Sequence, residues 1–249
     1  KNPLLRVIGL TATPYRMSTG LICAPGNILN RICYSAGVLD LMRQGYLCKL
    51  VGKSVLEPDT SDLHIRGGEF VADEAQALMT REGVVEAACA DLHRLAEGRR
   101  SVLVFCTGVA HAQAVAEELN RLNGWGAVTL FGDTPADERA ETIALFKEGI
   151  VRYLVNVNVL TTGFNATNID CVAMLRPTMS PGLYYQMVGR GFRIHPGKAD
   201  CLVLDFGGNI LRHGPVDRIE SFAQKAARER GAAPWKPCPE CKEVVALGT

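Results

Sequence analysis

Long hydrophobic runs and an excess of charge of either sign are both missing from this chain of 249 residues. No apolar run reaches the roughly 20 residues of a membrane-spanning helix, and we expect neither a membrane span nor a signal peptide. The formal net charge is +1, which excludes a global field that attracts nucleic acid, so any such site must be local. Hydrophobic residues make up 47% and charged residues 21%, which is typical of a globular chain with one large or two small domains.

A disulfide framework is not expected either, because the chain has nine cysteines, an odd number. Cys106, Cys171 and Cys201 lie in apolar, strand-like runs and are predicted to be small buried residues. This pattern indicates a reducing compartment.

A phosphate-cradling loop and a magnesium-binding carboxylate are missing as well. The run 191–198 ends in Gly-Lys, but its glycines are six apart rather than five, and Ala199 replaces the Ser/Thr of a P-loop. Asp73-Glu74 could be taken for the acidic pair that binds magnesium in such enzymes, but no apolar strand leads into it. Its acidic side chains suit instead the positive, N-terminal end of a helix. These residues therefore predict about half of an ATPase site, with the other half outside them.

Strand and helix patterns alternate through the second half of the chain. We expect strands over 102–106, 127–131, 152–157, 170–175 and 201–205, and helices over 109–122, 135–147 (with Thr134 as N-cap) and 181–192. Upstream we expect a strand over 4–10, a loop over 11–25, helices over 38–47, 73–79 and 84–96, and an irregular insertion over 52–68. The alternation predicts an α/β fold, a parallel sheet with helices on both faces that binds ligands at the carboxyl ends of its strands.

The run 185–193 carries the most informative pattern. Its polar residues and a glycine fall at i, i+3, i+4 and i+7, on one face of the expected helix: Gln186, Gly189, Arg190 and Arg193. Ser180 is expected to cap this helix, Pro181 to open it and Pro196-Gly197 to end it. Arginine forks bind phosphate oxygens in pairs, so the face suits a polyphosphate; a solvated basic face is the alternative.

Four other segments accompany this run: Gly9-Leu10-Thr11-Ala12-Thr13-Pro14, the strand 102–106 with Thr107-Gly108, Gly132-Asp133-Thr134-Pro135, and Leu160-Thr161-Thr162-Gly163-Phe164-Asn165. In this order the five resemble motifs III, IV, IVa, V and VI of superfamily 2 helicases, the DEAD/DEAH-type nucleic-acid motors. The resemblance covers residues 1–215. Within the superfamily, residues 9–16, residues 63–70 and the Cys-Pro-Glu-Cys tail resemble the RadD-like bacterial ATPases of DNA repair.

The resemblance implies a RecA-like sheet and a role for each motif. Arg190 and Arg193 would stabilise the charge that develops on a transferred phosphoryl group, and Gln186 would bridge to the loop 160–165. It implies ATP contacts from Gly163, Asn165 and Gly189, and coupling between the two halves of the motor by Thr11, Ala12 and Thr13. Many relatives carry Asp in place of Asn165, so here a neutral amide would hold the ribose. ATP and Mg²⁺ are the implied cofactors of the intact protein.

Small and hydroxylated residues stand where three expected strands end: Thr107, Gly108, Gly132, Asp133, Thr161 and Thr162. Hydroxyls and backbone N–H groups at such positions bind phosphates without reading bases, so this edge is expected to contact DNA. Helix capping is the alternative for Thr107. Residues 176–230 carry nine Lys/Arg against five Asp/Glu, a bias that ordinary surface charge also explains.

The tail contains Cys238-Pro239-Glu240-Cys241, the turn of a zinc knuckle. A structural zinc site needs four ligands, and no second pair follows before Thr249, so we expect half of a zinc ribbon, with two incidental cysteines as the alternative. A basic amphipathic helix over 217–230 and a linker over 232–237 precede it.

Three parts are thus expected: the end of a first RecA-like domain and a linker (1–37), the second RecA-like domain (38–215), and a basic helix with a partial zinc-ribbon tail (216–249). Because the chain opens at Lys1 inside an expected strand, we interpret it as a piece of a larger protein, inactive alone as an ATPase. The resemblance implies as partners single-stranded or branched DNA, the N-terminal RecA-like domain and a single-stranded-DNA-binding protein, in the bacterial cytoplasm at the nucleoid. The alternatives are the motor of a restriction endonuclease and a non-catalytic nucleic-acid or partner-binding module.

Overall fold

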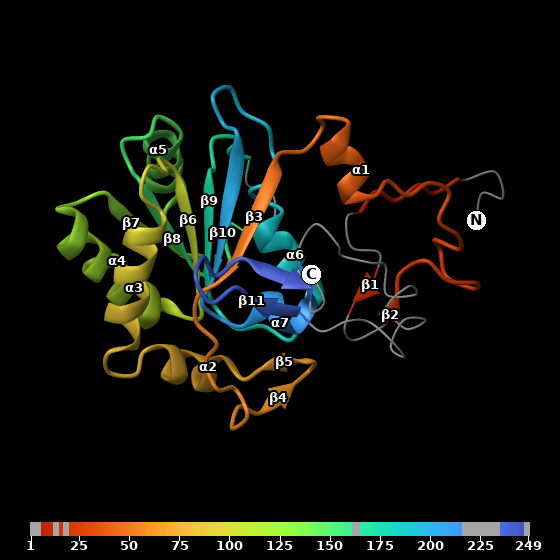
Figure 1. The fold of residues 1–249 in the computed structure, drawn as a ribbon. Coiled ribbons are helices and arrows are strands. Elements are labelled where there is room, and N and C mark those ends of the chain that lie inside the picture. The colour runs from red at the N-terminus through yellow and green to blue at the C-terminus, as the bar shows by residue number, and fades with distance from the viewer. Residues whose placement is uncertain (1–5, 12–14, 17–19, 161–164, 216–234, 247–249) are drawn as a thin grey trace.

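A six-stranded parallel sheet forms the centre of the molecule (Figure 1). The computed structural model describes residues 6–11, 15–16, 20–160, 165–215 and 235–246. The strand order is β3-β10-β9-β6-β8-β7, and every pairing is parallel. The strands are β3 (Lys49–Ser54), β6 (Val102–Cys106), β7 (Ala127–Leu130), β8 (Tyr153–Asn156), β9 (Cys171–Leu175) and β10 (Asp200–Asp205). The predicted α/β architecture is confirmed: the fold is RecA-like.

Helices cover both faces of this sheet. On one face α3 (Val84–Leu95) and α4 (Val109–Asn123) pack against the strands, with α2 (Ala72–Met79) beside them. The other face is covered by α1 (Val38–Arg43), α5 (Ala136–Lys147), α6 (Pro181–Val188) and α7 (Asn209–His213). The period-3.6 patterns that predicted helices around α2 to α5 are confirmed to within a few residues, and so is the start of α6. Helix α5 is capped differently, since Thr134 Oγ1 accepts from Phe131 N at 3.0 Å and the N-cap position falls to Pro135.

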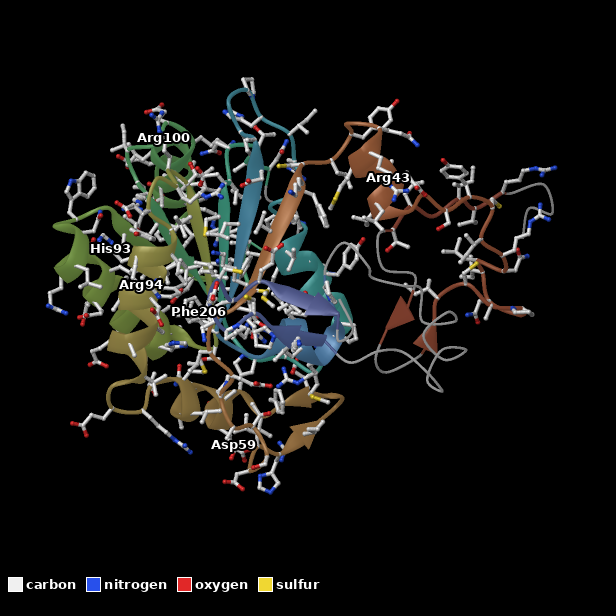
Figure 2. All side chains as sticks on the ribbon, in the orientation of Figure 1. Arg43, Asp59, His93, Arg94, Arg100 and Phe206 are labelled. Carbon is white, nitrogen blue, oxygen red and sulfur yellow. The ribbon has the colours of Figure 1, made fainter. Side chains whose placement is uncertain are left out.

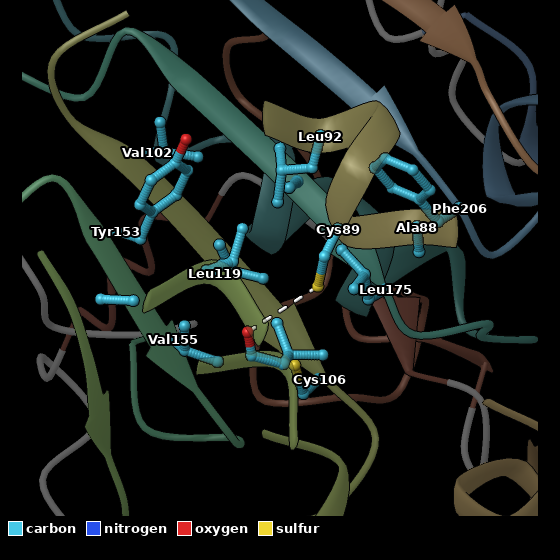
Figure 3. Packing of buried hydrophobic residues seen from close by; sticks show 14 of the residues in the cluster. Ala88, Cys89, Leu92, Val102, Cys106, Leu119, Tyr153, Val155, Leu175 and Phe206 are labelled. Atoms are coloured by element: carbon cyan, nitrogen blue, oxygen red, sulfur yellow. Dashed lines mark hydrogen bonds between the residues drawn. The ribbon is translucent and has the colours of Figure 1, made fainter. Parts of the chain in front are cut away.

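The core beneath α3 and α4 is apolar (Figure 3). Leu92 of α3 and Leu119 of α4 are 0% exposed and meet alternate residues of the strands, such as Val155 and Leu175. The thiol of Cys89 donates to the carbonyl of Val115 at 3.7 Å. The three cysteines predicted to be buried are buried, and each is a free thiol. No helix among the described residues is long and apolar enough to cross a membrane.

One strand of the central sheet and one helix packed on it were not expected from the sequence. Residues 49–54 form the edge strand β3 instead of leading into an irregular insertion, and residues 209–213 form α7. Gly52 interrupts the apolar pattern of β3, and its place explains why: a Cβ there would lie 3.3 Å from Ile210 Cδ1 of α7. The insertion continues as a short hairpin, β4 (Ile65–Arg66) with β5 (Glu69–Phe70).

The N-terminal segment does not form the expected strand within its described part. Residues 6–11 have no regular structure, and the only pairing nearby joins β1 (Tyr15–Arg16) to β2 (Gly20–Leu21) among the described residues. Ile8 is 86% exposed and Leu10 97% exposed. A strand needs a neighbouring strand for its backbone hydrogen bonds, and no strand pairing among the described residues includes residues 6–11.

At the other end of the chain, a hairpin docks on β3. Strands β11 (Trp235–Pro237) and β12 (Val244–Ala246) pair antiparallel, so the expected linker over 232–237 includes a strand. Ser54 N donates to Lys242 O at 3.0 Å, which covers part of the open edge of the sheet. The expected basic helix over 217–230 lies outside the described residues.

Gly207, directly after β10, lies against the backbone that leaves β9. A Cβ at this position would come within 2.7 Å of Pro177 N and 2.8 Å of Arg176 O. Both obstacles are main-chain atoms and cannot rotate away. Only glycine therefore lets the two strand exits approach this closely.

We predict that Gly207→Ala lowers the free energy of unfolding by about 1–3 kcal/mol, because overpacking displaces backbone. Gly182→Ala is the matched control, since its Cβ would meet only Ser180 Oγ at 3.7 Å and alanine favours a helix. Urea denaturation of both variants measures the difference. Equal stability of the two would contradict the close approach.

Candidate functional site

Helix α6 begins as the sequence predicts and ends earlier. Ser180 Oγ accepts from Leu183 N at 3.2 Å, and Pro181 occupies the first turn. The helix stops at Val188, so Arg190 and Arg193 lie in the turns that follow and not on the helix itself. The expected helix over 181–192 is wrong at this end.

Glycine and one lysine explain the early stop. Gly191 packs against β10, where a Cβ would lie 2.6 Å from Cys201 Sγ. Lys198 Nζ then donates to the carbonyls of Gly191 and Arg193, both at 2.8 Å. An ammonium that binds two carbonyls of this segment fixes its path. We call residues 189–195, which contain both arginines, the braced turn.

The braced turn is bonded to the last residue of the predicted motif V and to the residues that follow it. Arg193 Nη1 donates to Asn165 Oδ1, and the Thr167 hydroxyl bonds His195 Nδ1 at 2.9 Å. Two side-chain bonds therefore join residues 165–167 to residues 193–195. Thr161, Thr162 and Gly163, predicted as site residues, lie outside the described residues.

The two arginines share one electrostatic environment. Burial lowers the pKa of Arg190, and the charge of Arg193 lowers it further. Arg190 Nε donates to Gln186 O at 3.3 Å, which holds it near the end of α6. Adjacent guanidinium groups that repel each other gain energy from an anion between them, so the turn is suited to phosphate. Gly189 is the helix C-cap; a Cβ there would lie 2.8 Å from Tyr185 O.

The carboxyl ends of the strands bring the other predicted residues to one edge. Thr107 is 6% exposed, and its hydroxyl bonds His111 Nδ1 at 2.8 Å. Thr107 N also donates to that nitrogen, at 3.3 Å, so Nδ1 must be the unprotonated one and accepts both. Burial lowers the pKa of His111 to about 4, which keeps the ring neutral at pH 7. Gly108 is covered by the side chain of Gln76 from α2.

Gly132 and Asp133 are exposed at the end of β7. Arg139 Nη2 donates to the carbonyls of Phe131 at 3.0 Å and Gly132 at 3.1 Å, so this arginine shapes the loop. Thr11 is exposed, and the other two residues predicted to couple the halves of the motor, Ala12 and Thr13, lie outside the described residues. DNA contact by this edge and coupling by residues 11–13 both stay predictions.

A buried carboxylate organises the neighbouring strand ends. Asp205 is 0% exposed and accepts from Gly207 N at 3.0 Å, from Ile210 N at 2.6 Å and from Asn209 Nδ2 at 3.1 Å. Asn209 in turn accepts from Thr178 N at 2.9 Å and donates to Arg176 O at 2.8 Å. These bonds tie the exit of β10 to the exit of β9.

Glu69 joins the β4–β5 hairpin to the same place. Its carboxylate accepts from the Thr178 hydroxyl and, at 2.8 Å, from Met179 N. The Thr178 oxygen accepts from Ser180 N at 3.0 Å, one residue before α6 begins. The hairpin therefore helps to set where the helix that leads to Arg190 starts.

The tail forms a tight turn between β11 and β12. Cys238 N donates to Glu243 O at 2.8 Å, and Lys242 N to Cys238 O at 3.0 Å. Backbone N–H groups of Cys241 and Glu240 that bond the Cys238 sulfur lower its pKa. Within the described residues no group of three or more His, Cys, Asp or Glu side chains could hold a metal. The zinc ribbon stays a prediction.

Several positioning residues escaped the sequence reasoning, among them His111, His195, Lys198, Glu69 and Asp205. His111 follows Thr107 by one helical turn, so its bond was within reach of a local argument. Glu69 and Thr178 are 109 residues apart, and no local signal joins them.

The chain is similar in sequence to known helicases. A family model described as the helicase conserved C-terminal domain matches residues 85–195. A Schizosaccharomyces pombe protein named as a mitochondrial ATP-dependent helicase, irc3, is 36% identical and covers 94% of this chain. The ATP-dependent helicase IRC3 of Saccharomyces cerevisiae is 33% identical and covers 81%. The chain spans only 39% and 29% of the lengths of these relatives.

Among solved structures, a fragment of an HsdR subunit of a type I restriction enzyme from Vibrio vulnificus superposes with a TM-score of 0.64. It is 19% identical, and the match covers 78% of this chain and 39% of that one. At this identity the likeness shows the fold alone.

The environment of Asp205 generates a pH prediction. Burial raises its pKa from 3.8 to about 6 against the hydrogen bonds it accepts. The folded chain therefore holds this proton more tightly than the unfolded chain, and the stability it contributes is full below about pH 4 and lost as pH rises to about 6.

Two pKa units correspond to roughly 3 kcal/mol. We expect the stability of the wild type relative to Asp205→Asn, which cannot ionise, to fall by an amount of that order between pH 4 and pH 7. Urea unfolding of both proteins across this range is the measurement. A difference that stays constant with pH would show that Asp205 does not titrate there.

Proposed function

We propose that this chain, which contains the C-terminal domain of a superfamily 2 helicase, supplies the second half of an ATP-driven motor that moves along DNA. The braced turn at Arg190 and Arg193 carries this proposal. Its arginines are placed to reach the phosphates of an ATP molecule held by a first RecA-like domain. ATP closes the cleft between the two domains, and hydrolysis reopens it.

The chemistry assigned to these residues is electrostatic. Arg190 and Arg193 stabilise the charge that develops on the transferred phosphoryl group, and Asn165 holds Arg193 in place for it. Asn165 also offers an amide to the ribose, as expected from its position in motif V. The magnesium carboxylate and the phosphate cradle belong to the first domain, and residues 1–37 are assigned to the end of that domain. The exposed Ile8 and Leu10 suit a strand that pairs there.

We assign the carboxyl edge of the sheet to single-stranded DNA. Gly108, Gly132 and Asp133 lie at that edge, and its loops offer backbone groups rather than paired side chains that read bases. The resemblance of residues 9–16 and 63–70 to RadD-like ATPases supports a role in DNA repair in a bacterial cytoplasm, together with a single-stranded-DNA-binding protein. DNA-stimulated ATP hydrolysis without cleavage of the DNA separates this function from a restriction motor, and turnover itself separates it from a non-catalytic module.

In the intact protein, we expect Arg190→Ala and Arg193→Ala each to lower kcat for ATP by about 10³–10⁵, the effect of arginines that act on the transition state. Nucleotide affinity should change much less. Arg94→Ala is the control. Arg94 is exposed and pairs with Asp91 on α3, which covers the face of the sheet opposite to α6. A steady-state ATPase assay at saturating ATP and DNA decides: near wild-type turnover in either variant removes that residue from the site.

We also expect zinc in the intact protein, held by Cys238 and Cys241 with two ligands from beyond this tail. The N–H groups directed at the Cys238 sulfur favour the thiolate that zinc requires. Elemental analysis should find about one zinc per protein, lost in Cys238→Ser with Cys241→Ser and kept in Cys33→Ser, where an exposed cysteine is replaced. Zinc that survives the double substitution would disprove this assignment.

A further inference from the structure

An arginine outside the motifs lies at the carboxyl edge. Arg176 follows β9, and Asn158 follows β8, the strand on the other side of β6. Arg176 Nη1 donates to Asn158 Oδ1. The bond therefore passes over the end of β6, a span of two strand spacings or about 10 Å.

The register places Thr107 directly beneath this bond. Cys106 pairs with Leu175 and Phe105 pairs with Asn156. Continued one step past the pair with β9 and two steps past the pair with β8, this register brings Thr107 level with Arg176 and with Asn158. The Arg176 guanidinium therefore lies at the start of the Thr107-Gly108 loop, where the adjacent strands β9, β6 and β8 end.

The charge of the Arg176 guanidinium is balanced by fewer nearby negative charges than a buried cation normally has. Arg176 is half-buried, and among the described residues it forms no ion pair; its side-chain partner there is a neutral amide. Glu69 attracts it from nearby, but the Glu69 oxygens already accept from Thr178 and from the backbone of Phe70 and Met179. Burying a charge without a paired one is costly, so this position gains from an anion supplied by a ligand.

The position itself is well defined. Asn158 has a left-handed backbone, with φ of +59°, a conformation that asparagine tolerates better than most residues. Its exposed amide aims the arginine along the edge of the sheet. A planar fork with five N–H donors, one of them given to Asn158, has donors left for a phosphate.

We propose that Arg176, oriented by Asn158, binds a backbone phosphate of single-stranded DNA at the carboxyl end of β6. The inference rests on the proposed function, because it requires DNA to cross this edge. The contact neutralises one phosphate and reads no base. Arg176 is accordingly a DNA-binding residue that acts without nucleotide, unlike Arg190 and Arg193.

The test is fluorescence anisotropy of the intact protein, without nucleotide, on oligo-dT and on a mixed-sequence single strand at several salt concentrations. Arg176→Gln should weaken binding about tenfold on both strands, since it removes a charged hydrogen bond. It should also make the log–log salt slope shallower by about 0.7, the effect of one phosphate contact. The KM for ATP should stay within about twofold of wild type.

Arg100→Gln is the matched control. It removes the same charge from an exposed residue two positions before β6, at the amino ends of the strands. Figure 2 shows Arg100 at the end of the molecule opposite to Asp59, which lies in the segment after β3. We expect less than a twofold change from it. Asn158→Asp is the second variant: it keeps Arg176 in place but pairs it internally with a carboxylate, so DNA binding should again fall about tenfold while the melting temperature does not.

The outcomes are separable. Wild-type affinity and salt slope in Arg176→Gln, with the wild type binding DNA, overturn this inference alone. A wild type that binds no DNA overturns the proposed function beneath it. A raised KM for ATP with unchanged DNA affinity assigns Arg176 to nucleotide and also overturns the inference, as does weakening on only one of the two strands. If Arg176→Gln unfolds, Asn158→Asp decides the question.

Discussion

The buried carboxylate of Asp205 is the contact on which the functional edge depends. Its oxygens accept two backbone N–H groups and the Asn209 amide inside an apolar core, where an unsatisfied charge would be costly. Asn209 extends the network to Thr178, and Thr178 extends it to Glu69. Three stretches that are distant in sequence thus meet at one point: β10 with the adjoining α7, the loop before α6 and the β4–β5 hairpin. Each of these buried side chains bonds another member of the network, so displacing one of them leaves its partner unsatisfied.

The position of Arg190 and Arg193 depends on a second constraint, the close packing of Gly191 against β10. Gly191 allows the chain to lie against Cys201, and Lys198 then donates to the carbonyl of Gly191 and to that of Arg193, two residues further on. A continuous helix would place Arg193 one turn further along the α6 axis, away from residues 165–167. The early end of the helix is therefore what lets Arg193 meet Asn165 and His195 meet Thr167.

Most of the fold could be predicted from the sequence, because the strands and helices of the core have clear hydrophobic patterns of their own. Strands β6, β9 and β10 are apolar runs, and the apolar stripes of α3 and α4 mark their buried faces. The start of α6 was predictable from Ser180 and Pro181, whereas its end was not, because the stop depends on Cys201 and Lys198 from later in the chain. Strand β3 was hidden because Gly52 serves α7 and breaks the pattern. Glu69 bonds Thr178, 109 residues away, and Asn209 bonds Thr178, 31 residues away, so only the folded chain reveals these contacts.

These ties also place the two arginine groups on one short stretch of backbone. Arg176 precedes Thr178, whose oxygen bonds the N–H of Ser180 at the start of α6, and Arg190 and Arg193 follow the end of that helix. A helix of eight residues separates them. Thr178 is held from three sides, by Glu69, Asn209 and His213. Helix α6 is therefore the covalent link between the edge of the sheet and the braced turn, and hydrogen bonds from two other parts of the chain fix where it starts.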